Sequence, residues 1–293
     1  MKTVFTPGHI TGFFQIQTHK DPLKSGSRGA GIVLEDGCET VVAFRDANEN
    51  HVSVFIDGKS CACDTTKTVA AEILNATCGA FEVEVYHFPK LPLEYGFGLS
   101  AAGALGCALA LNSALDMGLS YRRLGEIAHR AEIEQGTGRG DVSAELSRGL
   151  VIRSREGAPG HGRIKSVPIN GYVVSFLVGG PLQTKTVLDD KSSLTAVNES
   201  GGRCLSELLN SPRPERFMEL SKRFTHASGL AQKEVLDAIL SLEKKGVTAA
   251  MNMLGNAVFT LTDDPEPTQS LLNYPTIVSK PLLKDIRSQD ELG

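Results

Sequence analysis

Residues that could bind an anion, hold a cation or accept a proton occur in three parts of the chain. A glycine-rich loop around Gly96 and Gly98 leads into an apolar stretch whose helix is predicted to begin near Ser100. The first N–H groups of a helix have no partners within it and lie at the positive end of its dipole, so this loop predicts an anion site. Glu132 and Asp141 follow, at the end of a second helical stretch and in the glycine-rich segment after it. Phosphate donors, metal ligands and a base are what phosphoryl transfer requires.

Each of these residues also fits a plain structural role. The loop could be an ordinary connection to a core helix with Ser100 as its N-cap. Glu132 could be a solvated helix carboxylate, and Asp141 could be a loop or N-cap residue. In the functional interpretation, Glu132 and Ser100 hold a magnesium ion, which prefers hard oxygen ligands and keeps several waters.

The glycine loop resembles the phosphate-binding signature of the GHMP small-molecule kinases, P-x-x-x-G-L-G-S-S-A-A. Leu99 replaces one family serine, which leaves Ser100 as the single hydroxyl. The start of the chain resembles the family's A-P-G-K/R motif, with His9 in place of the basic residue. Only Gly255 remains of the third family signature, in a segment that resembles the M-L-G-x-x-V-F run of the archaeal pantoate kinases, although a simple β-hairpin also fits. The resemblance assigns these residues to the ATP phosphates: Pro92, Gly96, Gly98, Leu99, Ser100, Ala101 and Ala102.

The resemblance also implies the remaining roles. It makes Asp141 the catalytic base and Glu132 a metal ligand, with Glu134 open as the alternative carboxylate. The implied reaction is ATP- and Mg²⁺-dependent phosphorylation of the 4-hydroxyl of pantoate in coenzyme A biosynthesis. A carboxylate substrate needs a cation, ideally the fork of an arginine. The candidate substrate contacts are Ser27, His129 and Arg153, each of which could instead be a turn, packing or surface residue.

Two other functions stay open at this stage. One is a GHMP kinase for another small alcohol, such as homoserine or shikimate. The other is a non-catalytic ligand sensor on the same fold, which would have no need of Ser100, Glu132 and Asp141 together.

The patterning of the chain predicts an α+β fold with mixed sheets, helices packed on one side and an ATP groove between two domains. A Gly/Pro/His-rich segment near residue 160 predicts the boundary between an N-terminal kinase domain, 1–160, and a C-terminal α+β domain, 161–293. A turn is expected at 35–38 and a glycine-rich loop at 24–31, and a local turn is the alternative to the family motif at 7–8. Helices are expected at 67–78, 100–112, 120–135, 193–209, 214–228 and 230–245, and strands at 40–44, 51–56, 81–86, 150–153, 172–178, 248–253, 257–261 and 276–280.

The composition narrows the class of protein. The 293 residues carry a net charge of −4 and no basic run, which argues against a nucleic-acid binder. No apolar run reaches membrane-spanning length, and the N-terminus does not resemble a signal peptide. The six cysteines lack the paired spacings of zinc sites. Cys61 and Cys63 are separated by one residue, a tight spacing for a disulfide, so we expect reduced cysteines in a cytoplasmic protein. The sequence leaves a monomer and a homodimer open.

Overall fold

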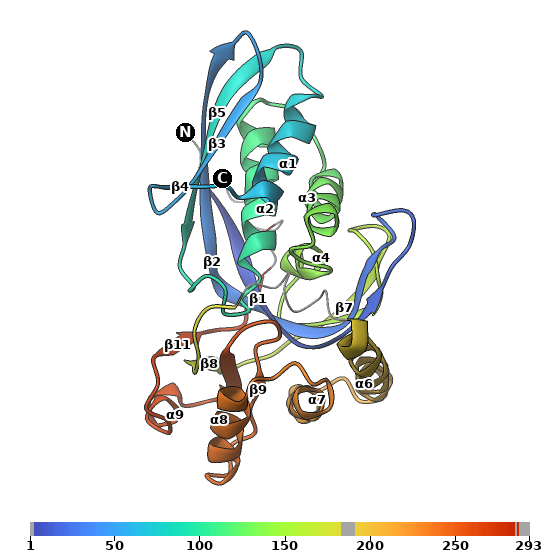
Figure 1. The fold of residues 1–293 in the computed structure, drawn as a ribbon, viewed down its shortest axis with the longest axis vertical. Helices are drawn as coiled ribbons and strands as arrows, with labels where there is room; N and C mark the ends of the chain where they lie inside the picture. The colour runs from blue at the N-terminus through green and yellow to red at the C-terminus, as the bar shows by residue number, and fades with distance from the viewer. Residues whose placement is uncertain (1–2, 183–190, 285, 287–293) are drawn as a thin grey trace.

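A computed structural model describes residues 3–182, 191–284 and 286, and Figure 1 shows their arrangement. The first sheet consists of β1 (Thr3–Gln17), β2 (Gly26–Ala47), β3 (His51–Ile56), β4 (Lys59–Cys61), β5 (Ala80–Pro89), β6 (Leu150–Arg155) and β7 (Arg163–Val167). Its strand order is β4-β3-β5-β2-β6-β7, with β1 paired to β2 beside this path. The long strand β2 therefore joins the two halves of the sheet, because β5 pairs with its second part and β6 with its first.

Helices cover one face of this sheet (Figure 1). They are α1 (Asp64–Leu74), α2 (Leu99–Ala114), α3 (Tyr121–Gln135) and the short α4 (Asp141–Glu145). Helix α2 is buried without interruption from Ala101 to Leu111. Its small residues allow close packing, since a Cβ on Gly106 would overlap the Thr40 side chain of β2. Ser120 caps α3 through a hydrogen bond from the Arg123 backbone N–H, as the sequence predicts.

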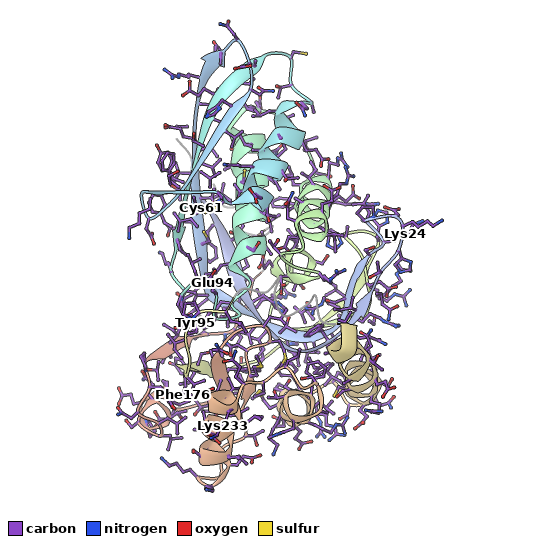
Figure 2. All side chains as sticks on the ribbon, viewed as in Figure 1. Lys24, Cys61, Glu94, Tyr95, Phe176 and Lys233 are labelled. Atoms are coloured by element: carbon purple, nitrogen blue, oxygen red, sulfur yellow. A yellow bond between two sulfur atoms is a disulfide. The ribbon has the colours of Figure 1, made fainter. Side chains whose placement is uncertain are left out.

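The second sheet is smaller and has the order β11-β8-β10-β9. Its strands are β8 (Tyr172–Leu177), β9 (Ala250–Met251), β10 (Ala257–Thr262) and β11 (Thr276–Ser279), and its helices are α6 (Lys191–Asn210), α7 (Pro214–Ala227), α8 (Lys233–Glu243) and α9 (Pro265–Gln269). Phe176, labelled in the lower part of Figure 2, is fully buried in this half. Phe13 of β1 packs on Phe217, and Phe217 packs on Phe259, so the N-terminal strand enters the second core.

The turn expected at 35–38 is wrong, and the glycine-rich loop expected at 24–31 is limited to its first two residues, because β2 begins at Gly26 and continues through both segments. Strands β1 and β2 pair from Thr3↔Val41 to Gln17↔Gly26, with one break in register between Pro7↔Gly37 and His9↔Val33 and another between Thr11↔Gly31 and Phe13↔Ala30. Register shifts around Pro7 and Thr11 accommodate the local irregularity. The glycines provide space within a strand, because a Cβ on Gly31 would overlap the imidazole of His9.

The other elements agree with expectation apart from their ends. The helix expected at 67–78 begins earlier, at Asp64, and ends at Leu74. The strand expected at 248–253 shortens to Ala250–Met251. The α+β class with helices on one side of a mixed sheet is confirmed. The boundary between 160 and 161 stays a prediction; β7, beyond it, pairs with β6 in the first sheet. No helix among the described residues has both the length and the apolar character needed to cross a membrane.

Candidate active site

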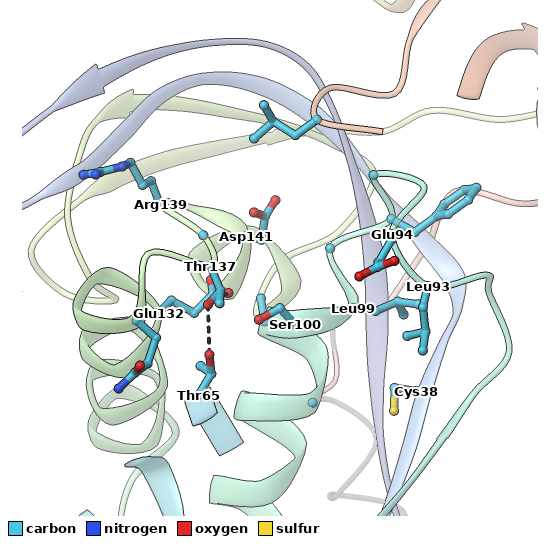
Figure 3. A pocket seen from close by; sticks show the side chains of 18 of the residues that line it. Cys38, Thr65, Leu93, Glu94, Leu99, Ser100, Glu132, Thr137, Arg139 and Asp141 are labelled. Atoms are coloured by element: carbon cyan, nitrogen blue, oxygen red, sulfur yellow. Dashed lines mark hydrogen bonds between the residues drawn. The ribbon is translucent and has the colours of Figure 1, made fainter. Parts of the chain in front are cut away.

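A cavity of about 670 Å³ lies where the two sheets meet, and Figure 3 shows the side chains around it. The start of α2, the connection from α3 to α4, and strands β1, β2 and β6 contribute to its lining. Met253 and Leu254 reach it from the loop between β9 and β10. Residues far apart in the chain, from Thr11 to Leu254, therefore line the same cavity.

The phosphate loop forms one wall of this cavity. Pro92, Gly96 and Gly98 line it, together with the first helical residues Leu99, Ser100 and Ala101. The helix begins at Leu99 with Gly98 as N-cap, in a left-handed conformation with φ 71°, so Ser100 is not the cap. The N–H groups of the first turn have no partner within the helix and face a lined space. This is the arrangement of an anion site.

Ala102 differs from the expectation that it contacts the phosphates. It is fully buried and does not line the cavity. Its N–H already donates to the Gly98 carbonyl oxygen, at 3.1 Å. The anion site therefore ends at Ala101, one residue earlier than the family pattern implies.

The Glu132 side chain extends from α3 toward Ser100 at the start of α2, and both residues line the cavity (Figure 3). Its side chain is buried, and Oε2 has no hydrogen-bond partner within the described residues. Burial, followed by the negative charge of Asp141, raises the pKa of Glu132 to about 8, although the Ser100 and Thr137 hydroxyls act in the opposite direction. A bound divalent cation would compensate this carboxylate. Glu134, the alternative from the sequence, is exposed and does not line the cavity.

The segment between α3 and α4 shapes this part of the site through its glycines. A Cβ on Gly138 would lie 2.6 Å from Glu132 Oε1, so only glycine leaves room for the carboxylate. Thr137 donates to Glu132 Oε1 at 3.4 Å and contacts the Thr65 hydroxyl of α1 at 3.0 Å, the bond drawn in Figure 3. Gly138 therefore allows this segment to pack closely against the Glu132 carboxylate.

Asp141 begins α4, and its side chain is 27% exposed toward the cavity. Its Oδ1 lies 2.7 Å from His9 Nδ1. Burial acts to raise the pKa of Asp141, but the hydrogen bond with His9 and the positive charge of Arg153 outweigh it and hold the pKa below its ordinary value. Asp141 is therefore ionised at neutral pH and able to accept a proton.

Arg153 and Ser27 meet beside Asp141. Arg153 is 3% exposed and Ser27 is 6% exposed, yet both line the cavity. Both side chains pack closely on Gly140, since a Cβ there would lie 2.6 Å from Ser27 Oγ and 3.0 Å from Arg153 Nε. Arg153 Nε is buried and has no hydrogen-bond partner among the described residues. This group of donors is suited to a carboxylate.

His129, the third expected substrate contact, lies elsewhere. It is buried under the start of β2, where its Nε2 lies 2.9 Å from the Ser25 carbonyl oxygen. It does not line the cavity. Its position at one helical turn from Glu132 turns it toward the β2 backbone, where it supports the strand that carries Ser27.

A disulfide lines the cavity and corrects the expectation of reduced cysteines for Cys61 and Cys63, whereas the other four cysteines are free. Cys61 and Cys63 are bonded, with Cα atoms 5.4 Å apart, a separation within the range for disulfides. Cys63 precedes α1 in a left-handed conformation, with φ 39°, and this turn brings the two sulfurs together across Ala62. Ile56, Pro89 and Leu93 line the same region.

Two further ionisable groups near the site, Glu145 and Arg139, carry no signal in the sequence that singles them out. Glu145 of α4 is completely buried, and neither carboxylate oxygen has a hydrogen-bond partner among the described residues. Burial raises the pKa of Glu145 well above its ordinary value, and the charges of Asp141 and Glu132 add to the effect. Arg139 lines the cavity (Figure 3). The substitution of His9 for a basic residue was a visible signal, but its partner Asp141 is 132 residues away.

Comparison with known proteins agrees with this geometry. Residues 64–149 match the family model of the GHMP kinases N terminal domain. The chain is 36% identical to the pantoate kinase of Thermococcus kodakarensis, over 89% of this chain and 88% of the relative. It is 34% identical to the pantoate kinase of Methanocaldococcus jannaschii, over 94% of this chain and 98% of the relative.

Solved structures show the same fold. A phosphotransferase related to the CoA biosynthesis pathway superposes with TM-score 0.86 and 33% identity, covering 97% of this chain and 96% of that chain. MDDEF in complex with MVAPP, AMPPCP and magnesium superposes with TM-score 0.68 and 14% identity, over 96% of this chain and 97% of that chain. On the identity and coverage of these relatives, the chain belongs to the pantoate kinase family of the GHMP kinases.

Proposed function

We propose that this protein transfers the γ-phosphoryl group of ATP to the 4-hydroxyl of pantoate, as a magnesium-dependent kinase of coenzyme A biosynthesis. The observation that carries the proposal is the convergence of Asp141 and Arg153 in one cavity with the open N-terminus of α2. This reaction requires a base, a receptor for the substrate carboxylate and a receptor for the phosphates, and it also requires ligands for the magnesium ion. The choice of pantoate as the substrate rests on the two pantoate kinases to which the chain is 36% and 34% identical.

ATP would lie against the glycine-rich loop and the start of α2. The N–H groups of Leu99, Ser100 and Ala101 would hold its phosphates, because they lie at the positive end of α2. The adenine ring of ATP would lie in the apolar part of the cavity, which is lined by Ile56, Leu93 and the disulfide. Pro92 and Gly96 complete the wall beside the phosphates.

Glu132 and Ser100 would hold the magnesium ion. The buried, unpartnered Oε2 of Glu132 is the kind of hard anionic ligand that magnesium prefers. When bound, the ion would neutralise charge on the phosphates. Glu132 would then be ionised, since the positive charge of the ion favours the carboxylate and opposes the effects of burial and Asp141 on its pKa.

Pantoate would bind between Arg153, Ser27 and Asp141. The Arg153 guanidinium would pair with its carboxylate, and Ser27 would add a hydrogen bond. The Asp141 carboxylate would accept the proton of the 4-hydroxyl as its oxygen attacks the γ-phosphorus. The new O–P bond forms while the bond to the bridging oxygen of ADP breaks, and ADP leaves with the electron pair.

A coupled assay of ADP release over a panel of acceptors tests the proposal. Pantoate should support turnover with a kcat/KM at least tenfold above those of homoserine, shikimate and other small hydroxy acids. Asp141→Asn should lose about 10²–10⁴-fold in rate while it keeps its fold and ATP binding, which excludes a contaminating kinase. Faster turnover of another acceptor would reassign the substrate, and ATP binding without turnover of any acceptor would favour a ligand sensor.

A cytoplasmic location and a homodimer stay predictions. Cell fractionation and sedimentation analysis, respectively, would test them.

A further inference from the structure

His9 lies between the two charged groups of the proposed acceptor site. Its Nδ1 is 2.7 Å from Asp141 Oδ1, and its Nε2 is 3.4 Å from Arg153 NH1. The residue is 1% exposed, so water does not compete for either contact. An arginine nitrogen only donates, so Nε2 must be the acceptor of this ring, and the proton must lie on Nδ1, where it donates to Asp141. Burial also lowers the pKa of His9, which agrees with a neutral imidazole.

The structure holds this ring in place from several sides. Gly31 of β2 faces it, and any side chain there would overlap the Nε2 edge of the imidazole. The His9 backbone N–H donates to the Phe97 carbonyl oxygen at 2.9 Å, which ties this part of β1 to the phosphate loop. Thr11 Oγ1 lies 3.5 Å from both His9 Nδ1 and Arg153 NH2. The imidazole therefore has a fixed position relative to the glycine-rich loop, to Asp141 and to Arg153.

We propose that His9 is a positioning residue whose neutral imidazole keeps Asp141 and Arg153 apart, so that one stays a free base and the other a free receptor for the acceptor's carboxylate. This inference rests on the proposed function and deepens it. Opposite charges attract strongly in a cavity of low dielectric, and an arginine and a carboxylate readily form a bidentate pair. Direct pairing would occupy the base and the receptor at the same time. With His9 between them, Asp141 and Arg153 each form a hydrogen bond to the imidazole and keep their other polar atoms available to the substrate.

Two amide variants separate the contacts of the two ring nitrogens. In His9→Asn the amide nitrogen lies near the position of Nδ1, so it keeps the donor to Asp141 and loses the contact with Arg153. In His9→Gln the longer side chain reaches the position of Nε2, so it keeps an acceptor for Arg153 and loses the donor to Asp141. His9→Ala removes both contacts and allows Arg153 to pair with Asp141.

We expect the two variants to differ in which kinetic constant changes. His9→Asn should keep kcat within about tenfold and raise the pantoate KM by more than that. His9→Gln should keep the pantoate KM within a few-fold and lose about 10²-fold in kcat, the usual effect of a base displaced by about 1 Å. The ATP KM should stay within a few-fold in both. Equal losses in the two variants would mean a merely structural role, and wild-type constants in His9→Ala would also overturn the proposal.

The ¹⁵N spectrum of histidine-labelled wild-type protein provides a test that needs neither substrate nor a folded variant. The His9 ring should be neutral and protonated on Nδ1 at pH 7. A ring protonated on Nε2, or on both nitrogens, would overturn the proposal. The two ideas therefore fail separately: wild-type protein inactive on pantoate removes the proposed function, whereas the wrong tautomer in an active enzyme removes the role of His9.

Discussion

At the scale of single residues, the carboxylates around the cavity are driven to different ionisation states. Burial raises the pKa of Glu132 to about 8, while His9 and Arg153 hold the pKa of Asp141 below its ordinary value despite burial. Groups whose pKa values are driven apart in one site usually have different roles. Here the ionised group is the proposed base, and the group that stays protonated without a cation is the proposed metal ligand.

Arg153→Ala should separate acceptor binding from ATP binding. A bidentate charge-assisted pair contributes about 1.5–3 kcal/mol, so its loss should raise the pantoate KM by about 10- to 150-fold. Arg153→Lys should rescue only part of this, because a point charge lacks the fork. Arg155→Ala is the matched control, since Arg155 lies on the same strand, is exposed and does not line the cavity. An unchanged pantoate KM, or an equal rise in the ATP KM, would show that Arg153 is not the receptor.

Glu145→Gln should make the stability of the protein less sensitive to pH. The raised pKa means that folded Glu145 keeps its proton above pH 4.5, where the unfolded chain releases it. Its contribution to stability is therefore complete below this pH and falls as the pH rises, by up to about 1.4 kcal/mol per pH unit. Glutamine has no proton to lose, so the variant should become progressively more stable than wild type from pH 5 to pH 8.

Urea unfolding at several pH values, without magnesium, measures this difference. Glu134→Gln is the control, because Glu134 is exposed on α3. Parallel stability curves for wild type and Glu145→Gln would contradict the assignment of Glu145 as a buried, protonated carboxyl.

At the scale of elements, the start of α2 depends on a glycine that is both left-handed and crowded. Gly98 has φ 71°, and a Cβ there would lie 3.0 Å from Glu145 Oε1 and 3.2 Å from the His9 carbonyl oxygen. Gly118 has a similar φ of 63° but no atom within 4 Å of an added Cβ. The two positions therefore share the backbone cost of an L-residue and differ in crowding.

Gly118→Ala should cost only the left-handed backbone term, about 1–2 kcal/mol of unfolding free energy, and leave the ATP KM unchanged. Gly98→Ala should cost more and raise the ATP KM, because the side chain displaces the first turn that receives the phosphates. Unfolding midpoints and ATP titrations of both variants measure this. Equal effects on stability and on the ATP KM would show that crowding at Gly98 plays no part.

Elements with a local sequence signal were predictable, and elements that depend on distant partners were not. Helix α3 carries its own cap, Ser120, and its spacing brings Glu132 to the buried face. The glycines of β2 look like a loop in the sequence, because nothing nearby shows that His9 and Phe13 require the space. The Cys61–Cys63 bond depends on a left-handed Cys63, which the residue type does not predict. The contact between His9 and Asp141 spans 132 residues.

At the scale of the whole molecule, the two sheets complete the site together. Strand β1 brings His9 into contact with Asp141, which lines the cavity, and carries Phe13 into the second core. In return, the loop after β9 reaches β1, where the Met253 N–H donates to the Thr11 carbonyl oxygen at 3.1 Å. The same loop packs on the backbone of the phosphate loop, which Figure 2 marks with Glu94 and Tyr95 where the upper and lower parts meet. The single glycine left of the third family signature lies at this contact.

Gly255→Ala should weaken ATP binding through this contact between the halves. A Cβ on Gly255 would overlap the carbonyl group of Tyr95 and the backbone nitrogen of Gly96. Backbone atoms cannot rotate away, so either the phosphate loop or the loop after β9 must shift. We expect the ATP KM to rise at least tenfold, because the N-terminus of α2 would lose its place relative to Pro92 and Gly96, while the pantoate KM changes little. Gly180→Ala is the control, since Gly180 accepts a hydrogen bond from Asn256 but faces open space. If Gly255→Ala and Gly180→Ala gave the same ATP KM, the second sheet would have no part in shaping the phosphate site.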